Sequence, residues 1–165
     1  MALAARASYE FQPGGLKIAL VVLSGEVIFD GALVGVTKAG GGSLSTDGYA
    51  QNWGPDVTGE MIFVGMARIT DQNSGDGTDD KVTGDGTLEI EVDISGPIIK
   101  NATVAGLDNI NDVCDVVYAS DDNTLTLTAT TGSTEIGIVT RYSGTSGTGD
   151  VHLFPFITHA GSLIG

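Results

Sequence analysis

The residues best suited to chemistry in this chain are the carboxylates between positions 71 and 86, in the stretch DQNSGDGTDDKVTGDG. Aspartates and glycines this close together suggest a calcium-binding loop, whose oxygen ligands must stand at fixed positions. The spacing does not fit, because counting from Asp71 places Asp76 where the loop needs its turn glycine and Val82 where it needs its bidentate glutamate. We therefore expect a solvent-exposed acidic loop without a specific calcium site.

Nucleophiles and metal ligands give no catalytic pattern either. The run 144–147, GTSG, lacks the spacing of a nucleophile elbow. His152 stands on a predicted strand and His159 in the C-terminal tail, without a third ligand at a metal-binding spacing. Asp56 and Glu60 could act as a glycosidase pair, but chance pairs are common among 21 acidic residues. We expect a protein that is not an enzyme and uses no cofactor or metal.

Two aromatic residues could bind a ligand. Tyr49 and Trp53, the only tryptophan, lie in a loop rich in glycine and polar residues. Such a loop can stack a ring against a sugar or anchor an interface, and as often it folds the ring back over the end of a barrel. Tyr49 and Trp53 are therefore the candidate ligand-binding residues of an alternative function, a carbohydrate-binding or adhesive β module.

The elements that must position these residues are β-strands. The chain has 25 glycines and many threonines and valines, which favour strands joined by tight turns. The clearest pattern is 112–142, in which apolar residues alternate with polar ones in three runs separated by turn formers. These runs predict two successive hairpins and hence a three-stranded antiparallel meander.

Further strands are predicted along the rest of the chain. The run 61–69 is apolar on both faces, which indicates a strand that is central or covered by a partner. In 88–94 apolar residues alternate with Glu89, Glu91 and Asp93, which predicts one buried and one exposed acidic face. Asp30-Gly31 predicts a hairpin, and 97–111 reads as an irregular crossover. The remaining predicted strands are 18–23, 27–29, 32–37 and 151–156.

Composition restricts the partners. The formal net charge is −14, and such a surface repels phosphate backbones, so we expect no nucleic-acid binding. No apolar run approaches the roughly 20 residues that span a bilayer, so we expect no membrane insertion. Cys114 is the only cysteine, so no intrachain disulfide can form, and its place between Val113 and Asp115 suggests a small core residue.

The predicted strands also carry a family resemblance. The chain resembles the capsid cement, or head decoration, proteins of tailed bacteriophages over about two thirds of its length. The acidic stretch 71–93 has no counterpart in the resemblance. The matching runs are Asp115-Val116-Val117-Tyr118-Ala119, Asp121-Asp122-Asn123-Thr124, Ile136-Gly137-Ile138-Val139 and Val151-His152-Leu153, with a weaker echo at Gly31-Ala32-Leu33-Val34-Gly35-Val36.

The resemblance implies a function and a set of partners. The expected fold is an all-β antiparallel barrel or sandwich, β-tulip-like, with residues 1–17 as an extended N-terminal arm and 18–165 as a single β domain. The expected function is that of a structural virion protein, made in the host cytoplasm, that binds the outer surface of the capsid and cements the major capsid protein lattice. It also implies homo-oligomers, most often trimers. The alternative adhesive module would act on a virion or free.

The apolar residues of the arm are the candidate capsid contacts. They surround a Pro-Gly-Gly joint at 13–15, and an isolated domain would leave them with little to cover them. A neighbouring subunit, the parent domain or the capsid could each supply the cover. The candidate residues are Leu3, Tyr9, Phe11 and Leu16.

Overall fold

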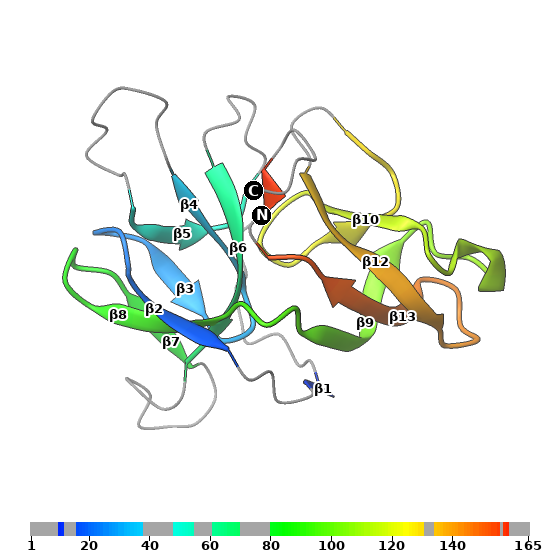
Figure 1. Cartoon of the computed structure of the whole chain (residues 1–165), viewed down its shortest axis with the longest axis horizontal. Helices are drawn as coiled ribbons and strands as arrows, with labels where there is room; N and C mark the ends of the chain where they lie inside the picture. Colours follow the sequence, from blue (N-terminus) through cyan, green and yellow to red (C-terminus); the bar gives the residue numbers. More distant parts are fainter. Residues whose placement is uncertain are drawn as a thin grey trace.

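The computed structural model describes residues 10–11, 16–37, 48–54, 61–69, 80–130, 134–155 and 157–158. Strands make up 56% of them. The helical structure in these ranges is one short 3-10 turn, η1 (Ile110–Asp112). The prediction of an all-β barrel or sandwich is therefore confirmed. The strands form two lobes that lie next to each other along the longest axis of the molecule (Figure 1).

The N-terminal lobe is built on a sheet with the strand order β2-β8-β6-β4-β5. The sheet curls until its two ends meet at a single bridge between Val22 and Ala50, where the Leu23 N–H donates to the Ala50 carbonyl at 3.1 Å. A two-stranded ribbon of β3 and β7 stands beside it. The strands are β2 (Lys17–Val21), β3 (Val27–Phe29), β4 (Leu33–Thr37), β5 (Ala50–Asn52), β6 (Met61–Arg68), β7 (Lys81–Thr83) and β8 (Glu89–Asp93).

The C-terminal lobe is a closed barrel of five strands in the order β9-β11-β10-β12-β13, with β13 pairing back onto β9. Its strands pass close to one another at Gly137, where an added Cβ would overlap the His152 carbonyl oxygen. Glycine at 137 is therefore required by the packing of β12 against β13. The strands are β9 (Ile98–Ala105), β10 (Val116–Ala119), β11 (Leu125–Thr126), β12 (Thr134–Tyr142) and β13 (Thr148–Leu153).

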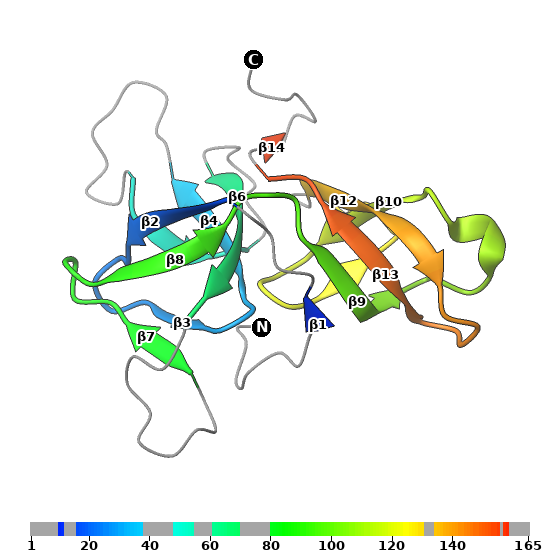
Figure 2. The same cartoon turned by 60° about the horizontal axis from the view of Figure 1, so that its bottom comes forward.

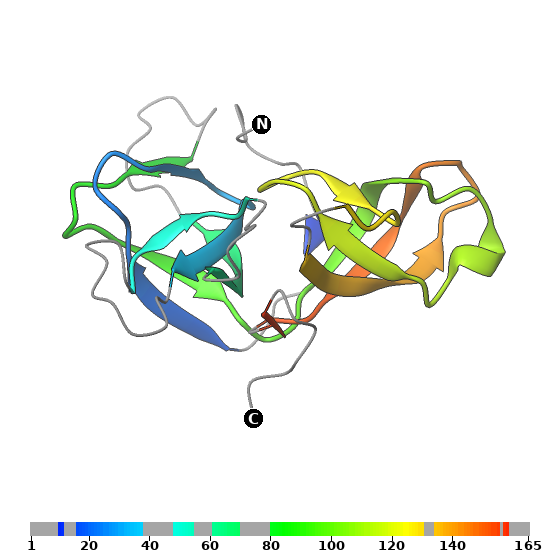
Figure 3. The same ribbon diagram turned by 90° about the horizontal axis from the view of Figure 1, so that it is seen from above.

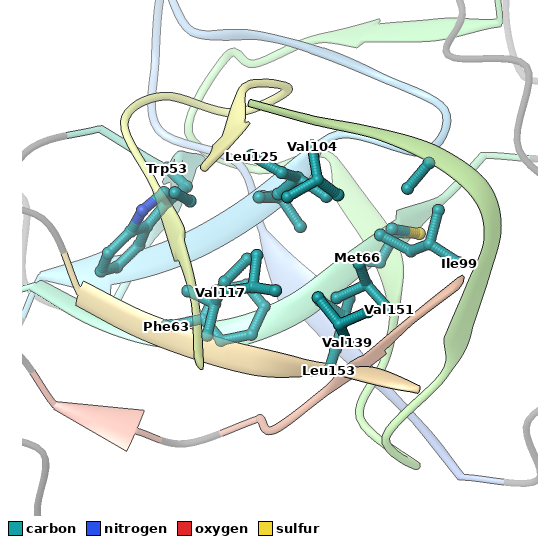
Figure 4. Packing of buried hydrophobic residues seen from close by; sticks show 14 of the residues in the cluster. Trp53, Phe63, Met66, Ile99, Val104, Val117, Leu125, Val139, Val151 and Leu153 are labelled. Atoms are coloured by element: carbon teal, nitrogen blue, oxygen red, sulfur yellow. The ribbon is translucent and has the colours of Figure 1, made fainter. Parts of the chain in front are cut away.

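Strand β6 belongs to the cores of both lobes. Phe63 and Met66 lie in one buried cluster with the barrel residues, whereas Val64 and Ala67 lie in the other cluster with the N-terminal lobe. Figure 4 shows Phe63 and Met66 among side chains of the barrel strands. The expected burial of both faces of this strand is thus confirmed, and the cause is its position between two cores. The predicted domain 18–165 contains two lobes whose packing meets at β6.

Two short strands each pair with the lobe that lies farther from them in the sequence. Strand β1 (Glu10–Phe11) precedes the N-terminal lobe but pairs antiparallel with β9 of the barrel. Strand β14 (Ile157–Thr158) follows the barrel but pairs antiparallel with β6 of the N-terminal lobe. Both crossings are visible between the lobes in Figures 2 and 3. Each lobe is therefore completed by a strand from the far end of the chain.

Two predicted hairpins are wrong in their pairing. The Asp30-Gly31 turn exists, but β3 pairs with β7 while β4 pairs with β5 and β6, so the two strands part after the turn. The hairpin of β10 and β11 is confirmed. The three-stranded meander is wrong. Strand β12 pairs with β10 and not with β11, and β11 pairs in parallel with β9.

Three further expectations are corrected. The irregular crossover predicted at 97–111 contains β9, the strand that closes the barrel. Cys114, expected to be a small core residue, is exposed. It lies in a turn before β10 with a φ of 79°, and its N–H donates to the Val139 carbonyl. Asp93 is buried, since its carboxylate turns inward to accept bonds from Ser95.

Candidate docking surface

The candidate arm residues are only partly covered by the structure. Leu3 and Tyr9 lie outside the described residues, and for Phe11 the backbone alone is described, in register with Ile99 of β9. Leu16 is 58% exposed although its carbonyl is bonded to the Ile94 N–H, so the backbone at the start of β2 is fixed while the side chain is open. The structure thus places one large apolar side chain at the root of the arm without a cover.

The surface beside Leu16 is charged. Lys17 Nζ lies 2.6 Å from Glu91 Oε2, and both side chains are about half exposed. A cavity of about 290 Å³ opens on the same face of the sheet; the residues that line it are Ala19, Arg68, Ile69, Val82, Glu89, Ile90 and Glu91. Small Ala19 lies opposite Glu91 in the strand pairing, which leaves the depression between larger neighbours. This surface combines apolar walls with carboxylates.

Behind this surface is a buried charge that sequence reasoning missed. Asp93 Oδ1 accepts bonds from the Ser95 N–H at 3.0 Å and the Ser95 hydroxyl at 2.6 Å. Arg68 Nη2 approaches Asp93 Oδ2 at 3.6 Å, an ion-pair distance longer than a hydrogen bond. The signal for this arrangement is the serine two residues after the aspartate, which is typical of an Asx turn.

The two aromatic candidates differ in their exposure. Trp53 is 1% exposed, and its ring meets Phe63 edge to face at a centroid distance of 5.7 Å. Asn52, the residue before Trp53, is held in place because its side-chain amide donates to Glu26 Oε1 at 2.8 Å. Tyr49 is half buried. The placement of Trp53 corresponds to an aromatic folded over a barrel end, and it leaves no ring face open for a sugar.

A second polar cluster lies on the barrel at Asp150. The Asp150 carboxylate accepts bonds from Arg141 Nε at 2.7 Å, Arg141 Nη2 at 3.0 Å and the Asn101 N–H at 3.0 Å. These bonds and the burial act in opposite directions, and the Arg141 bonds dominate and lower the pKa of Asp150 below its ordinary value. Because both β9 and β12 change register beside Asp150, the carboxylate stabilises two irregular strands.

The structure describes only some of the other residues considered for chemistry. Of the acidic stretch 71–86 the structure describes 80–86, where Asp85 closes a turn through bonds to Thr87 that lower the pKa of Asp85. His152 is half buried with its ring edge against Phe154, and His159 lies outside the described residues, as do Asp56 and Glu60. No three described His, Cys, Asp or Glu side chains are grouped to hold a metal ion.

Two exposed apolar residues were not anticipated. Leu88, on the face of 88–94 that was predicted to be buried, is 39% exposed. Ile110 is 65% exposed on η1, which Asn109 and Asp112 hold as a capping box at the tip of the barrel lobe. Within the described ranges, no helix has the length and apolar character needed to cross a membrane. No family model, curated protein or solved structure matches the chain.

Proposed function

We propose that this protein is a capsid cement protein, which binds the outer surface of an assembled phage head and stabilises the major capsid protein lattice. The observation that carries the proposal is the location of the segments that resemble that family. The runs 115–119, 121–124, 136–139 and 151–153 fall on or between strands β10 to β13 of one closed barrel. Segments that are separate in the sequence therefore belong to one folded unit.

The mechanism of stabilisation is mass action. A protein that binds the assembled lattice and not its free subunits stabilises the lattice by RT ln(1 + [L]/Kd) at each site, and the effect is repeated over many sites. The net charge of −14 keeps most of the surface solvated, so docking requires a segment with little charge. Residues 1–9 carry one basic residue and no acidic residue, and include Leu3 and Tyr9.

The test is to remove the distal arm and measure binding to heads assembled without this protein. Deletion of residues 2–9 retains β1 and its pairing with β9, so the fold should be unchanged. Burial of one large apolar side chain contributes about 1 to 2 kcal/mol, which corresponds to a roughly 5- to 30-fold change in Kd. We expect the deletion to weaken head binding by at least this factor, with little change in the melting temperature.

The control is Ile110→Ser, which removes an exposed apolar side chain from η1 of the barrel lobe. Its head binding should equal that of the unchanged protein. Full-length protein that does not bind undecorated heads would refute the proposed function. Unchanged binding after the deletion would instead assign the contact to another surface.

A further inference from the structure

The outer edge of β2 is an open sheet edge with unused backbone groups. The even-numbered residues of this segment make its hydrogen bonds to β8. The Ile94 N–H donates to the Leu16 carbonyl, and the Val22 N–H donates to the Leu88 carbonyl. Antiparallel pairing alternates, so the N–H and C=O groups of Lys17 and Ala19 point away from β8. Among the described residues no strand pairs with this edge until Val22 meets Ala50. In Figure 2, β2 lies beside β8 at the margin of its sheet.

Such an edge is a site for strand addition, because an added strand satisfies its backbone donors and acceptors. This edge lacks several of the usual protections, since the five residues Lys17–Val21 contain neither proline nor a register shift against β8. Lys17 is its only charge. Ala19 and Leu16 are exposed beside it, and Ile18 and Leu20 are only partly buried against the core of the lobe.

We propose that the occupant is β2 of a second copy of this chain, added antiparallel with Ile18 opposite Ile18 about a twofold axis. This register places Lys17 opposite the partner's Ala19 and Leu16 opposite the partner's Leu20. Four backbone hydrogen bonds then join the two copies, because each Lys17–Ala19 pair exchanges two. The added strand ends short of Ala50, which occupies the outward position beside Val22.

The side chains on both faces of the edge match in this register. On the inner face, Leu16, which is 58% exposed, covers the partly buried Leu20 of the other copy. On the outer face, each Lys17 lies one strand away from Glu91 of the other copy, with only the small Ala19 between them. The cavity of about 290 Å³ over Ala19 and Glu91 therefore receives the aliphatic stem of the incoming Lys17.

Charge explains why this edge pairs with itself. Most surfaces of a chain with net charge −14 repel another copy, but the segment 16–25 contains Lys17 and no acidic residue. The contact is isologous, so it closes at two copies and differs from the trimers that the family resemblance implies. It also assigns Leu16 to the contact between copies and leaves the distal arm residues to the capsid. The inference does not depend on capsid binding.

The first test is the mass of the full-length protein by size exclusion with light scattering. We expect a dimer at micromolar concentration, and a monomer for Ala19→Pro, because proline removes an outward donor that the β2–β8 ladder does not use. The matched control is Thr83→Pro on β7. The bonds of β7 to β3 come from even-numbered residues such as Gly84, so the N–H of Thr83 is also outside the ladder. This variant should remain a dimer. A monomeric or trimeric unchanged protein, or a dimeric Ala19→Pro, would overturn the inference.

Charge reversal gives a test that does not depend on proline. Lys17→Glu places like charges beside Glu91 and should yield monomers that unfold cooperatively. The double variant Lys17→Glu with Glu91→Lys restores opposite charges within and between copies and should recover the dimer. Recovery of the dimer supports the pairing even if Ala19→Pro does not fold. A Lys17→Glu variant as dimeric as the unchanged protein would contradict it.

The register is tested by cross-linking. In a Cys114→Ser background, Ile18→Cys should form a disulfide-linked dimer on mild oxidation, because residues directly opposite at a non-hydrogen-bonded position have Cα atoms about 4.5 Å apart. Val21→Cys has no such partner in this register and should remain monomeric on a non-reducing gel. Efficient linkage through Val21→Cys and none through Ile18→Cys would exclude the register.

Discussion

Phe63→Ala should destabilise both lobes together. Phe63 is fully buried on β6 and packs in the cluster that contains the barrel residues. Replacing a buried phenylalanine by alanine costs about 3 to 5 kcal/mol from lost transfer energy and the cavity that remains. For a protein of this size, that corresponds to a fall in the melting temperature of roughly 6 to 20 °C. The loss should appear in the barrel as well as in the N-terminal lobe, because the side chain lies where the two cores meet.

The assay is urea unfolding, followed by fluorescence of Trp53, whose ring contacts Phe63, and by far-ultraviolet circular dichroism. The unfolding midpoints reported by the two probes should fall together to a lower urea concentration. Amide hydrogen exchange should become faster in β12 as well as in β4. Phe29→Ala, in the cluster of the N-terminal lobe away from the barrel, is the control for a phenylalanine lost from one lobe. Two separate transitions in Phe63→Ala, with exchange in β12 unchanged, would refute the coupling of the lobes.

Three further predictions concern single residues of the barrel. Asp150→Asn should destabilise the protein at neutral pH; because the pKa of Asp150 is lowered below 3.8 in the fold, the difference from the unchanged protein in urea unfolding should fade as the pH falls below that value and persist above it. Gly137→Ala should cost more than the roughly 1 to 3 kcal/mol of ordinary overpacking, since backbone atoms of β13 stand in the way; Gly144→Ala, at a φ of 87° in open space, should cost about 1 to 2 kcal/mol, and equal melting temperatures for the two would contradict this. Cys114 should react with a thiol reagent in the folded protein, and reaction only after denaturation would show that it is covered.

The sequence predicts strands well where the alternation is regular. The runs around β6, β8, β10 and β12 fall on observed strands because apolar residues recur along each of them. Strand β9 was missed because its phase changes in the middle. Ile99 and Ala102 are both buried but lie three positions apart, and Asn101 between them has a φ of 51°. An extra residue in a strand moves the later apolar residues to positions of the other parity, so the sequence no longer shows the alternation that predicts a strand.

Pairing between strands was predictable only where it is local. The hairpin of β10 and β11 follows from the turn formers between them, whereas the pairing of β3 with β7 joins segments that are distant in the sequence. At the candidate docking surface, the apolar character of Leu16 was readable from the chain. The open edge of β2 was not, because an edge is defined by which strands fail to pair with it.

The reciprocal crossing of β1 and β14 sets an order on biosynthesis. A ribosome delivers the chain from its N-terminus, so the residues of β6 emerge long before Ile157, which later pairs beside Phe63. Until β14 has been made, part of β6 in the N-terminal lobe therefore stays unpaired. Strand β1 likewise stays unpaired until β9 has been made. Contacts of such large sequence separation slow folding and leave strand edges open to nascent neighbours. During translation, therefore, these strand edges stay unpaired until the later segments of the chain have been made.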